Sequence, residues 1–451
     1  MKMNDLSRLK FFEISNQPFV FDRETSQVIL LNEVETPQLV QNLRAFDKGN
    51  SFSYGEEALI DADELFDVIN SGPASTLVND LKHVKPSYSS LVLPIASQCN
   101  LKCPYCFAQT NHGGFSFPSY NEDAIDRLLD RLHELNGDTP TTLIFFGGEP
   151  LIKFNLIEYT VNCVKEKYPD MKIGYSITTN GTLINRKVAD FFHENNVAVL
   201  LSMDGYDNEF NYRKFRNGKS SVDRVLKSIE LLKSSNVYFE IRATLTSDNP
   251  YLYETHMFFE KLEVPYQIAF AYPSENTSHS SLSTFSEDSL VGLRKAYNRL
   301  IEHYVERSKK GLPFYDKLLP KIIGAIESRQ KLIFSCSAGI NYFTILANGD
   351  IHYCAHLMNN PEFVLGNLYD RKLKNSFISH PITPKAVDQI AECENCWIKN
   401  LCAGGCTSQK ISEKLSPFGS YSRRKCALER LQYEYYLKLY VLSQSIGLTQ
   451  P

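Results

Sequence analysis

Residues 93–108 form the most informative segment of this sequence, "LPIASQCNLKCPYCFA". Within it an apolar run is followed by Cys99, Cys103 and Cys106, in the spacing C-x3-C-x2-C. A closed tetrahedral zinc site takes four protein ligands, and disulfides take cysteines in pairs. Three thiols on one loop therefore predict a metal-containing site with one position open to a ligand that is not protein. A partial zinc site or a set of buried thiols is the alternative.

Length and composition set the general class of the protein. A chain of 451 residues exceeds the usual size of a single core, so we expect one large domain with smaller ones. Hydrophobic residues make up 43% and charged residues 22%, as in ordinary globular proteins. The net charge of −4 gives no basic footprint, which argues against nucleic acid as the partner.

The compartment is expected to be the cytoplasm. The start "MKMNDLSRLKFFEISNQ" is polar and does not resemble a signal peptide. No uninterrupted apolar run is long enough to cross a bilayer. Thiols stay reduced in the cytoplasm, so the eleven cysteines favour metal or cluster ligation over disulfides.

The order of apolar and polar runs predicts an α/β chain. Short apolar runs before residue 35 indicate a strand meander, and two helical stretches follow it, as in a small winged-helix-like docking module. Six strand candidates then alternate with helices, which predicts a parallel, right-handed partial (β/α)6 barrel whose largely apolar strands are covered on both faces. The expected parts are the module at 1–85, the barrel at 88–310, a cysteine-rich domain at 330–430 and a C-terminal helix at 431–451.

Unusual residues follow the first four predicted barrel strands. They are the cysteine loop, "GGEP" (147–150), "TTNG" (178–181) and "SMDG" (202–205). Working residues of such folds lie at the C-terminal ends of the strands. The four motifs should therefore meet on one rim of the barrel.

A second cysteine set lies in the C-terminal part of the chain. It reads C-x12-G-x4-C, then C-x2-C-x5-C-x3-C, then a last cysteine. Zinc ribbons are the structural alternative, but seven thiols do not divide into two closed four-ligand sites. The members are Cys336, Cys354, Cys393, Cys396, Cys402, Cys406 and Cys426.

The first cysteine loop, with its aromatic residue before the third cysteine, and "GGEP" resemble the signature of radical S-adenosylmethionine (SAM) enzymes. The resemblance implies that the loop holds a [4Fe-4S] cluster whose open iron is chelated by SAM. It places "GGEP" at the methionine amino group, with a serine and an arginine near the ribose and carboxylate of SAM. A capping serine, a surface arginine and a turn asparagine are the alternative interpretations. The implied cofactor-binding residues are Tyr105, Gly147, Gly148, Glu149, Pro150, Asn180, Ser202 and Arg213.

The seven-cysteine pattern, including its glycine at Gly349, resembles the SPASM extension of radical SAM enzymes. By resemblance, one auxiliary [4Fe-4S] cluster is closed by four cysteines, and a second is held at three corners. Tyr342 stands where some relatives supply a fourth ligand, which leaves one iron of the second cluster open. Cys163 belongs to neither set and is expected to be buried and inert. The implied ligands are Cys393, Cys396, Cys402 and Cys426 for the first, and Cys336, Cys354 and Cys406 for the second.

The choice of chemistry depends on the residues after Cys354. Anaerobic sulfatase-maturing enzymes are expected to carry an aspartate directly after this cysteine, and Ala355 stands there instead. His356 is a candidate replacement base or simply a polar neighbour. The wording of the motifs looks most like thioether-forming peptide maturases of the sactipeptide and ranthipeptide type, including the freyrasin class. The resemblance implies a precursor peptide with a leader, and an electron donor such as flavodoxin or ferredoxin, as partners.

The predicted function is thus formation of a thioether between a cysteine sulfur and a carbon of a ribosomally made peptide. Within enzymes, the alternatives are carbon–carbon or carbon–oxygen crosslinking, epimerisation and formylglycine-type oxidation. Outside enzymes, the alternative is a scaffold that binds zinc or clusters. The substrate peptide and the attacked carbon do not follow from the sequence.

Overall fold

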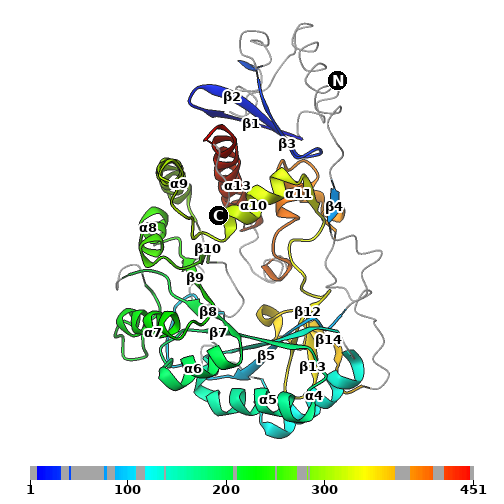
Figure 1. Cartoon of the computed structure of the whole chain (residues 1–451). Coiled ribbons are helices and arrows are strands. Elements are labelled where there is room, and N and C mark those ends of the chain that lie inside the picture. Colours follow the sequence, from blue (N-terminus) through cyan, green and yellow to red (C-terminus); the bar gives the residue numbers. More distant parts are fainter. Residues whose placement is uncertain are drawn as a thin grey trace.

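A nine-stranded sheet is the largest sheet in the described residues of the computed structural model, and it lies in the lower half of Figure 1. Its strand order is β10-β9-β8-β7-β6-β5-β12-β13-β14, and β5 to β10 are mutually parallel and in chain order. The structure describes residues 8–31, 40–41, 76–78, 87–107, 117–136, 139–206, 211–248, 251–271, 282, 285–370, 386–409 and 421–446.

The six parallel strands confirm the predicted α/β unit. Each strand is followed by a helix, as expected for βα units in tandem. The strands are β5 (Ser90–Ala96), β6 (Thr141–Gly147), β7 (Ile173–Thr179), β8 (Val197–Ser202), β9 (Phe239–Leu245) and β10 (Tyr266–Phe270). The helices are α4 (Glu122–Asn136), α5 (Phe154–Lys167), α6 (Arg186–Glu194), α7 (Val222–Ser234), α8 (Leu252–Leu262) and α9 (Glu287–Lys309).

Helix α4 illustrates why these helices form and pack. Ile125, Leu128, Leu129 and Leu132 repeat at intervals of three or four residues, so they share one face, and that face is buried. Other helices begin at capping side chains. The Asn185 side chain accepts a hydrogen bond from the Val188 amide at the start of α6, which satisfies a donor that the helix leaves unpaired.

The two faces of the barrel sheet differ in burial. Along β6 and β9, alternate residues are fully buried and the residues between them are half-buried. Buried residues such as Phe145 and Ile241 belong to the core shared with the helices. The half-buried ones, among them Phe146 and Arg242, lie on the other face of the sheet. The apolar strands predicted that both faces of the sheet are covered. In the structure, only the face toward the helices is completely covered.

The cysteine-rich region continues the barrel sheet. Strand β12 (Tyr342–Ile345) pairs in parallel with β5, and β13 (Asp350–His352) and β14 (Val364–Asn367) follow it in antiparallel pairs. A shorter pair joins β4 (Thr76–Val78) to β11 (Gln330–Leu332). The sequence patterns did not predict either connection, because both join segments that are far apart in the chain.

The N-terminal strands form a separate antiparallel sheet, as the meander predicted. Its strands are β1 (Leu9–Ile14), β2 (Gln17–Asp22) and β3 (Gln27–Leu30), at the top of Figure 1. Phe12, Phe19 and Phe21 pack on α10 (Leu318–Glu327), α11 (Lys399–Cys402) and α13 (Tyr421–Ile446). Except for residues 40 and 41, which are helical, the two helical stretches predicted between residues 36 and 72 lie outside the described residues.

Helix α13 closes the chain and begins before residue 431, so that it includes Cys426. Within the described ranges, none of the helices combines the length and the apolar character needed to cross a membrane.

We predict that Phe21→Ala loosens the N-terminal sheet from the body. Phe21 is 1% exposed and packs edge-on against Trp397, the sole tryptophan, with ring centroids 6.2 Å apart. Truncating such a buried aromatic side chain costs about 3–5 kcal/mol. Urea unfolding followed by Trp397 emission should show a lower midpoint. The control is Leu30→Ala, since Leu30 is 55% exposed and its loss should leave the midpoint unchanged.

Candidate functional site

The first cysteine loop leaves the C-terminal end of β5 and is held by backbone contacts. The Leu101 amide donates to Cys99 Sγ at 3.4 Å, and the Cys106 amide donates to Cys103 O at 3.2 Å. Burial, with the charges of Glu149 and Cys106, raises the pKa of Cys99 to about 11. These three thiols lie within electrostatic reach of one another, and iron binding would displace their protons.

The "GGEP" segment follows β6 and presses against the backbone that leads into this loop. The Gly148 amide donates to Ala96 O at 2.7 Å, and the Glu149 amide donates to Gln98 O at 2.8 Å. A Cβ on Gly147 would lie 2.1 Å from Ala96 O, and one on Gly148 would lie 2.2 Å from Gln98 O. Both glycines are therefore needed for this close approach of the two chain segments.

Glu149 is fully buried and joins three parts of the rim. Its carboxylate accepts hydrogen bonds from the Leu151 amide at 3.1 Å, Thr179 Oγ1 at 2.6 Å and the Asn180 amide at 2.8 Å. It thereby caps the short 3-10 helix Pro150–Lys153 and fixes the end of β7. Burial raises the pKa of Glu149 to about 7, and the three donors oppose this shift.

Asn180 contacts the cysteine loop directly. Its Nδ2 donates to Asn100 Oδ1 at 2.9 Å and lies 3.8 Å from Cys99 Sγ. Its Oδ1 accepts from the amide and hydroxyl of Thr182 at 3.0 and 2.6 Å, which is the geometry of an asparagine turn. Asn180 thus combines the turn role and a place beside the predicted cofactor site.

A buried hub of three polar side chains lies across the rim. Asp204 Oδ1 accepts from Arg213 Nε at 3.0 Å, and its Oδ2 accepts from the Tyr105 hydroxyl. The Arg213 guanidinium also lies 5.5 Å from the Tyr105 ring centroid. Burial alone would lower the pKa of Arg213, but Asp204 and Tyr105 raise it above its ordinary value, so the cation is firmly held. Ser202 ends β8 two residues before Asp204 and is almost fully buried.

His356 lies on the barrel side of the cysteine-rich region, in the 3-10 helix Ala355–Leu357. Its ring stacks on Phe107 with centroids 4.0 Å apart, and Phe107 stacks in turn near Phe146 of β6. His356 keeps an exposed surface in spite of this stacking. Burial among these groups, with the charge of Arg242, lowers the pKa of His356 to about 4, so the imidazole is neutral at pH 7.

Cys336, Cys354 and Cys406 come together beside β12 and β13. Burial raises the pKa of Cys336 and of Cys354, and the charge of Cys406 adds to the rise in both. Cys406 Sγ is 3.0 Å from Ser408 Oγ. Tyr342 neighbours Cys354 and Cys336. The phenol of Tyr342 is a harder ligand than a thiolate. This set therefore offers three soft donors, the thiols of its cysteines.

Cys396, Cys402 and Cys426 form the other group, and Cys393 lies one turn before Cys396. Arg430 approaches this group from α13, with its Nη1 3.9 Å from Cys396 Sγ. Cys163 belongs to neither set: it is 5% exposed on α5, and its Sγ donates to Asp126 Oδ1 at 3.3 Å.

The donor sets fit polynuclear clusters. No three His, Cys, Asp or Glu side chains in the described part of the chain are arranged around a single metal ion. In an iron–sulfur cluster each thiolate binds a different iron, so the sulfurs stand farther apart than in a mononuclear site. Thiolates are the ligands that such clusters take.

Two contacts of the site, those made by Asp204 and Arg430, were not predicted from the sequence motifs. Asp204 anchors Arg213, and an acid directly after a predicted strand end was the available signal. Arg430 lies one helical turn after Cys426, and a cation at that spacing from a predicted ligand could have been recognised.

Two family models match parts of the chain that contain cysteines of both sets. The family model of the radical SAM superfamily matches residues 93–249, and that of an iron-sulfur cluster-binding domain, SPASM, matches residues 336–397. An uncharacterised protein of Methanocaldococcus jannaschii is 32% identical over 303 residues, covering 65% of this chain and 91% of its own. The cysteine-type anaerobic sulfatase-maturating enzyme of Clostridium perfringens strain 13 is 28% identical over 346 residues, covering 73% and 91%.

Two solved structures share the fold. Native anSMEcpe with bound AdoMet superposes with a TM-score of 0.63 at 24% identity, covering 78% of this chain and 99% of its own. Streptococcus suis SuiB bound to precursor peptide SuiA gives 0.52 at 17% identity, covering 90% and 96%. The fold is thus an α/β radical SAM fold with a small N-terminal antiparallel sheet and a C-terminal SPASM domain.

We predict that Gly148→Ala empties the first cysteine site. The added Cβ would meet Gln98 O at 2.2 Å, so the backbone that carries Cys99 must shift. Iron analysis after anaerobic reconstitution should fall from about twelve irons per chain, three cubanes, to about eight. The matched control is Gly292→Ala within α9, where an added Cβ meets nothing within 4 Å. An unchanged iron content in Gly148→Ala would contradict the role of this close approach.

Proposed function

This chain belongs to the radical SAM superfamily, and we propose that it joins a cysteine sulfur to a carbon within a ribosomally made precursor peptide. The observation that carries the proposal is the second three-cysteine group, Cys336, Cys354 and Cys406, with Tyr342 beside it. A cluster held there has an open iron, which is a suitable seat for the thiolate of a substrate cysteine.

Specific residues would hold the cofactors. Cys99, Cys103 and Cys106 would bind the cluster at which SAM sits, and Arg213 and Ser202 would contact SAM. When bound and reduced, this pair would supply a 5′-deoxyadenosyl radical that can take one hydrogen atom from carbon. An auxiliary cluster would accept the one electron released when the carbon–sulfur bond forms. The protein's part is to position the reactants and exclude water.

The barrel interior is suited to that task. On one side, Phe107, Ile144 and Phe146 belong to an apolar cluster that also contains Ala355 and Met358 from the cysteine-rich region. Such a wall excludes water from a reactive carbon centre. On β9 and β10, Arg242 Nη1 donates to Gln267 Oε1 at 2.7 Å, which provides a polar wall for peptide groups.

His356 is the proposed proton acceptor for the substrate thiol. It lies two residues after Cys354. Its lowered pKa leaves the imidazole neutral but weakly basic, so this role requires that binding to iron first acidify the substrate thiol.

Formylglycine-type oxidation is the second candidate, favoured by the similarity to the sulfatase-maturating enzyme of Clostridium perfringens. Ala355 argues against it, since a methyl group cannot take the proton that an aspartate would accept.

The leader of the peptide is proposed to dock on the N-terminal module, residues 1–85. Strand β3 is a candidate edge for strand addition, because its only ladder among the described residues is with β2. An acidic electron donor, flavodoxin or ferredoxin, is the second proposed partner.

The product distinguishes the candidate reactions. Incubated anaerobically with its precursor peptide, SAM and dithionite, the reconstituted enzyme should yield a peptide lighter by two hydrogen atoms, with one thiol per crosslink resistant to alkylation. Mass spectrometry before and after alkylation measures both. A modified peptide in which every cysteine still alkylates would rule out the thioether. The control is Cys103→Ala, which removes a ligand of the SAM-binding cluster and should leave the peptide unmodified.

Asp204→Asn should weaken SAM binding without emptying the cluster sites. The substitution keeps the shape of the side chain but removes the charge that holds Arg213, and breaking a buried charge pair costs about 2–5 kcal/mol. Equilibrium dialysis with SAM should show at least a tenfold higher Kd at unchanged iron content. The control is Asp223→Asn, at an exposed position of α7, which should bind SAM as the unmodified enzyme does. An unaltered Kd in Asp204→Asn would exclude the proposed role of the hub.

A further inference from the structure

We propose that an open basic groove between α6 and α7 is the docking site of an acidic, single-electron donor protein that serves the cysteine loop of Cys99. The inference rests on the proposed function only in requiring a cluster at that loop. The transfer moves one electron: the donor is oxidised by one electron and the cluster is reduced by one, and no atom changes place.

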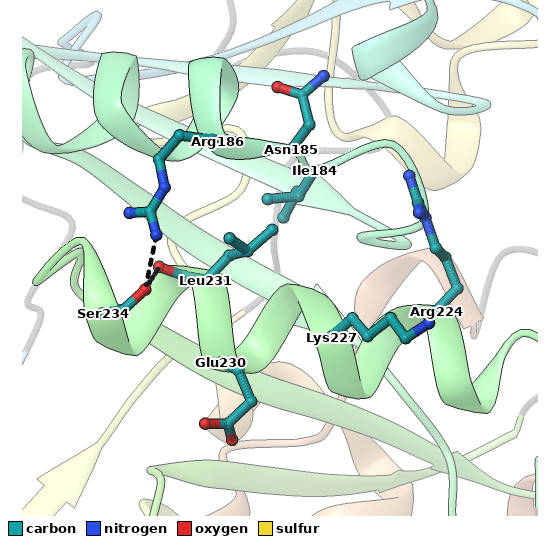
Figure 2. A pocket seen from close by; sticks show the side chains of 8 residues that line it. All are labelled: Ile184, Asn185, Arg186, Arg224, Lys227, Glu230, Leu231 and Ser234. Atoms are coloured by element: carbon teal, nitrogen blue, oxygen red, sulfur yellow. Dashed lines mark hydrogen bonds between the residues drawn. The ribbon is translucent and has the colours of Figure 1, made fainter.

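The groove has a basic wall and an apolar floor. It has a volume of about 580 Å³ and is lined by Ile184, Asn185, Arg186, Arg224, Lys227, Glu230, Leu231 and Ser234. Figure 2 shows Ile184 and Leu231 facing the space between the helices, with the three cations around them. Glu230 is the one acid among the lining residues, so the lining carries three cations and one anion.

The three cations are only partly neutralised by neighbours. Arg186 lies 3.7 Å from the exposed carboxylate of Asp190 and donates to Ser235 Oγ at 2.8 Å. Arg224 Nε donates to a backbone oxygen, and within the described residues Lys227 has no ion pair. The chain as a whole carries a net charge of −4, so this concentration of positive charge is local.

A second group of cations lies beside the cysteine loop. The segment before α7 carries Lys214, Arg216 and Lys219, and it pairs with the loop, since the Lys102 amide donates to Lys214 O at 2.8 Å. Arg216 Nε donates to Cys99 O at 3.0 Å. Positive charge therefore lies both in the groove and beside the backbone of a predicted cluster ligand.

A short chain of hydrogen bonds also connects the groove with Cys99. Arg224 Nε donates to Thr182 O at 2.9 Å. Thr182 Oγ1 donates to Asn180 Oδ1 at 2.6 Å, and Asn180 Nδ2 lies 3.8 Å from Cys99 Sγ. Electron transfer weakens steeply with distance, and this chain of contacts through Thr182 and Asn180 gives a short route from the groove to the predicted ligand Cys99.

The occupant is argued from charge and shape. Basic surfaces attract acidic partners and accelerate their encounter, and a transient redox contact needs steering more than a large dry interface. The apolar floor of Ile184 and Leu231 suits a protein surface better than a free anion, which would leave these side chains uncovered.

The test uses the anaerobically reconstituted enzyme with all its clusters and an acidic flavodoxin. Lys227→Glu, alone and with Arg186→Glu, reverses charge at exposed positions of the groove. At low salt, stopped-flow reduction of the enzyme by reduced flavodoxin should slow about tenfold or more in the double variant. The Kd for oxidised flavodoxin, measured by titration calorimetry, should rise correspondingly. Added salt should abolish both differences.

Two controls separate docking from other effects. Lys321→Glu on α10 makes the same charge change at an exposed position on another helix and should behave as the unmodified enzyme. Dithionite, which needs no docking surface, should reduce every variant equally. A failure of the peptide proposal would appear as an unmodified peptide with dithionite, and would leave the flavodoxin result intact.

Three outcomes would overturn the inference. The first is a double variant that binds and accepts electrons from flavodoxin as the unmodified enzyme does at low salt. The second is an equal loss in Lys321→Glu, which would indicate a general charge effect. The third is binding of inorganic phosphate at the groove without any effect of the substitutions on flavodoxin, which would make it a small-anion site only.

Discussion

The close approach between the end of β6 and the segment that leads into Cys99 organises the whole rim. Two backbone hydrogen bonds join these segments, and the positions that make the contact have no space for a side chain. Once the backbones meet, Glu149 is carried into the protein interior, where its carboxylate must find donors. It finds them at Leu151 and at the end of β7, so one contact between neighbouring strands fixes the geometry of a third.

On the opposite side of the rim, a second buried carboxylate also depends on hydrogen-bond donors. Asp204 is 2% exposed and is tolerated there because Arg213, Tyr105 and the Thr244 amide all donate to it. The arginine is consequently held before any ligand arrives, and little conformational entropy remains to be lost when a carboxylate binds. The rim is thus preorganised by partners that belong to the chain itself.

Much of this arrangement followed from local patterns in the sequence. The six βα units were readable because each strand is an apolar run bounded by turn residues, and the cysteine spacings and "GGEP" are short-range features. Asp204 and Arg430 were not predicted as contacts, since their partners Tyr105 and Cys396 are remote in the chain and become neighbours only in the fold. The pairing of β12 with β5 was missed for the same reason: no local pattern specifies which edge a distant strand will choose.

The pairing of β12 with β5 also matters for any attempt to separate the barrel from the cysteine-rich region. Without β12, strand β5 would become an open edge of a parallel sheet, with unpaired amides and carbonyls directly below the cysteine loop. Exposed edges of this kind recruit other chains and lead to aggregation. The cluster-binding region therefore also acts as an edge protector for the barrel, so that removing it would endanger the solubility of the remainder as well as its chemistry.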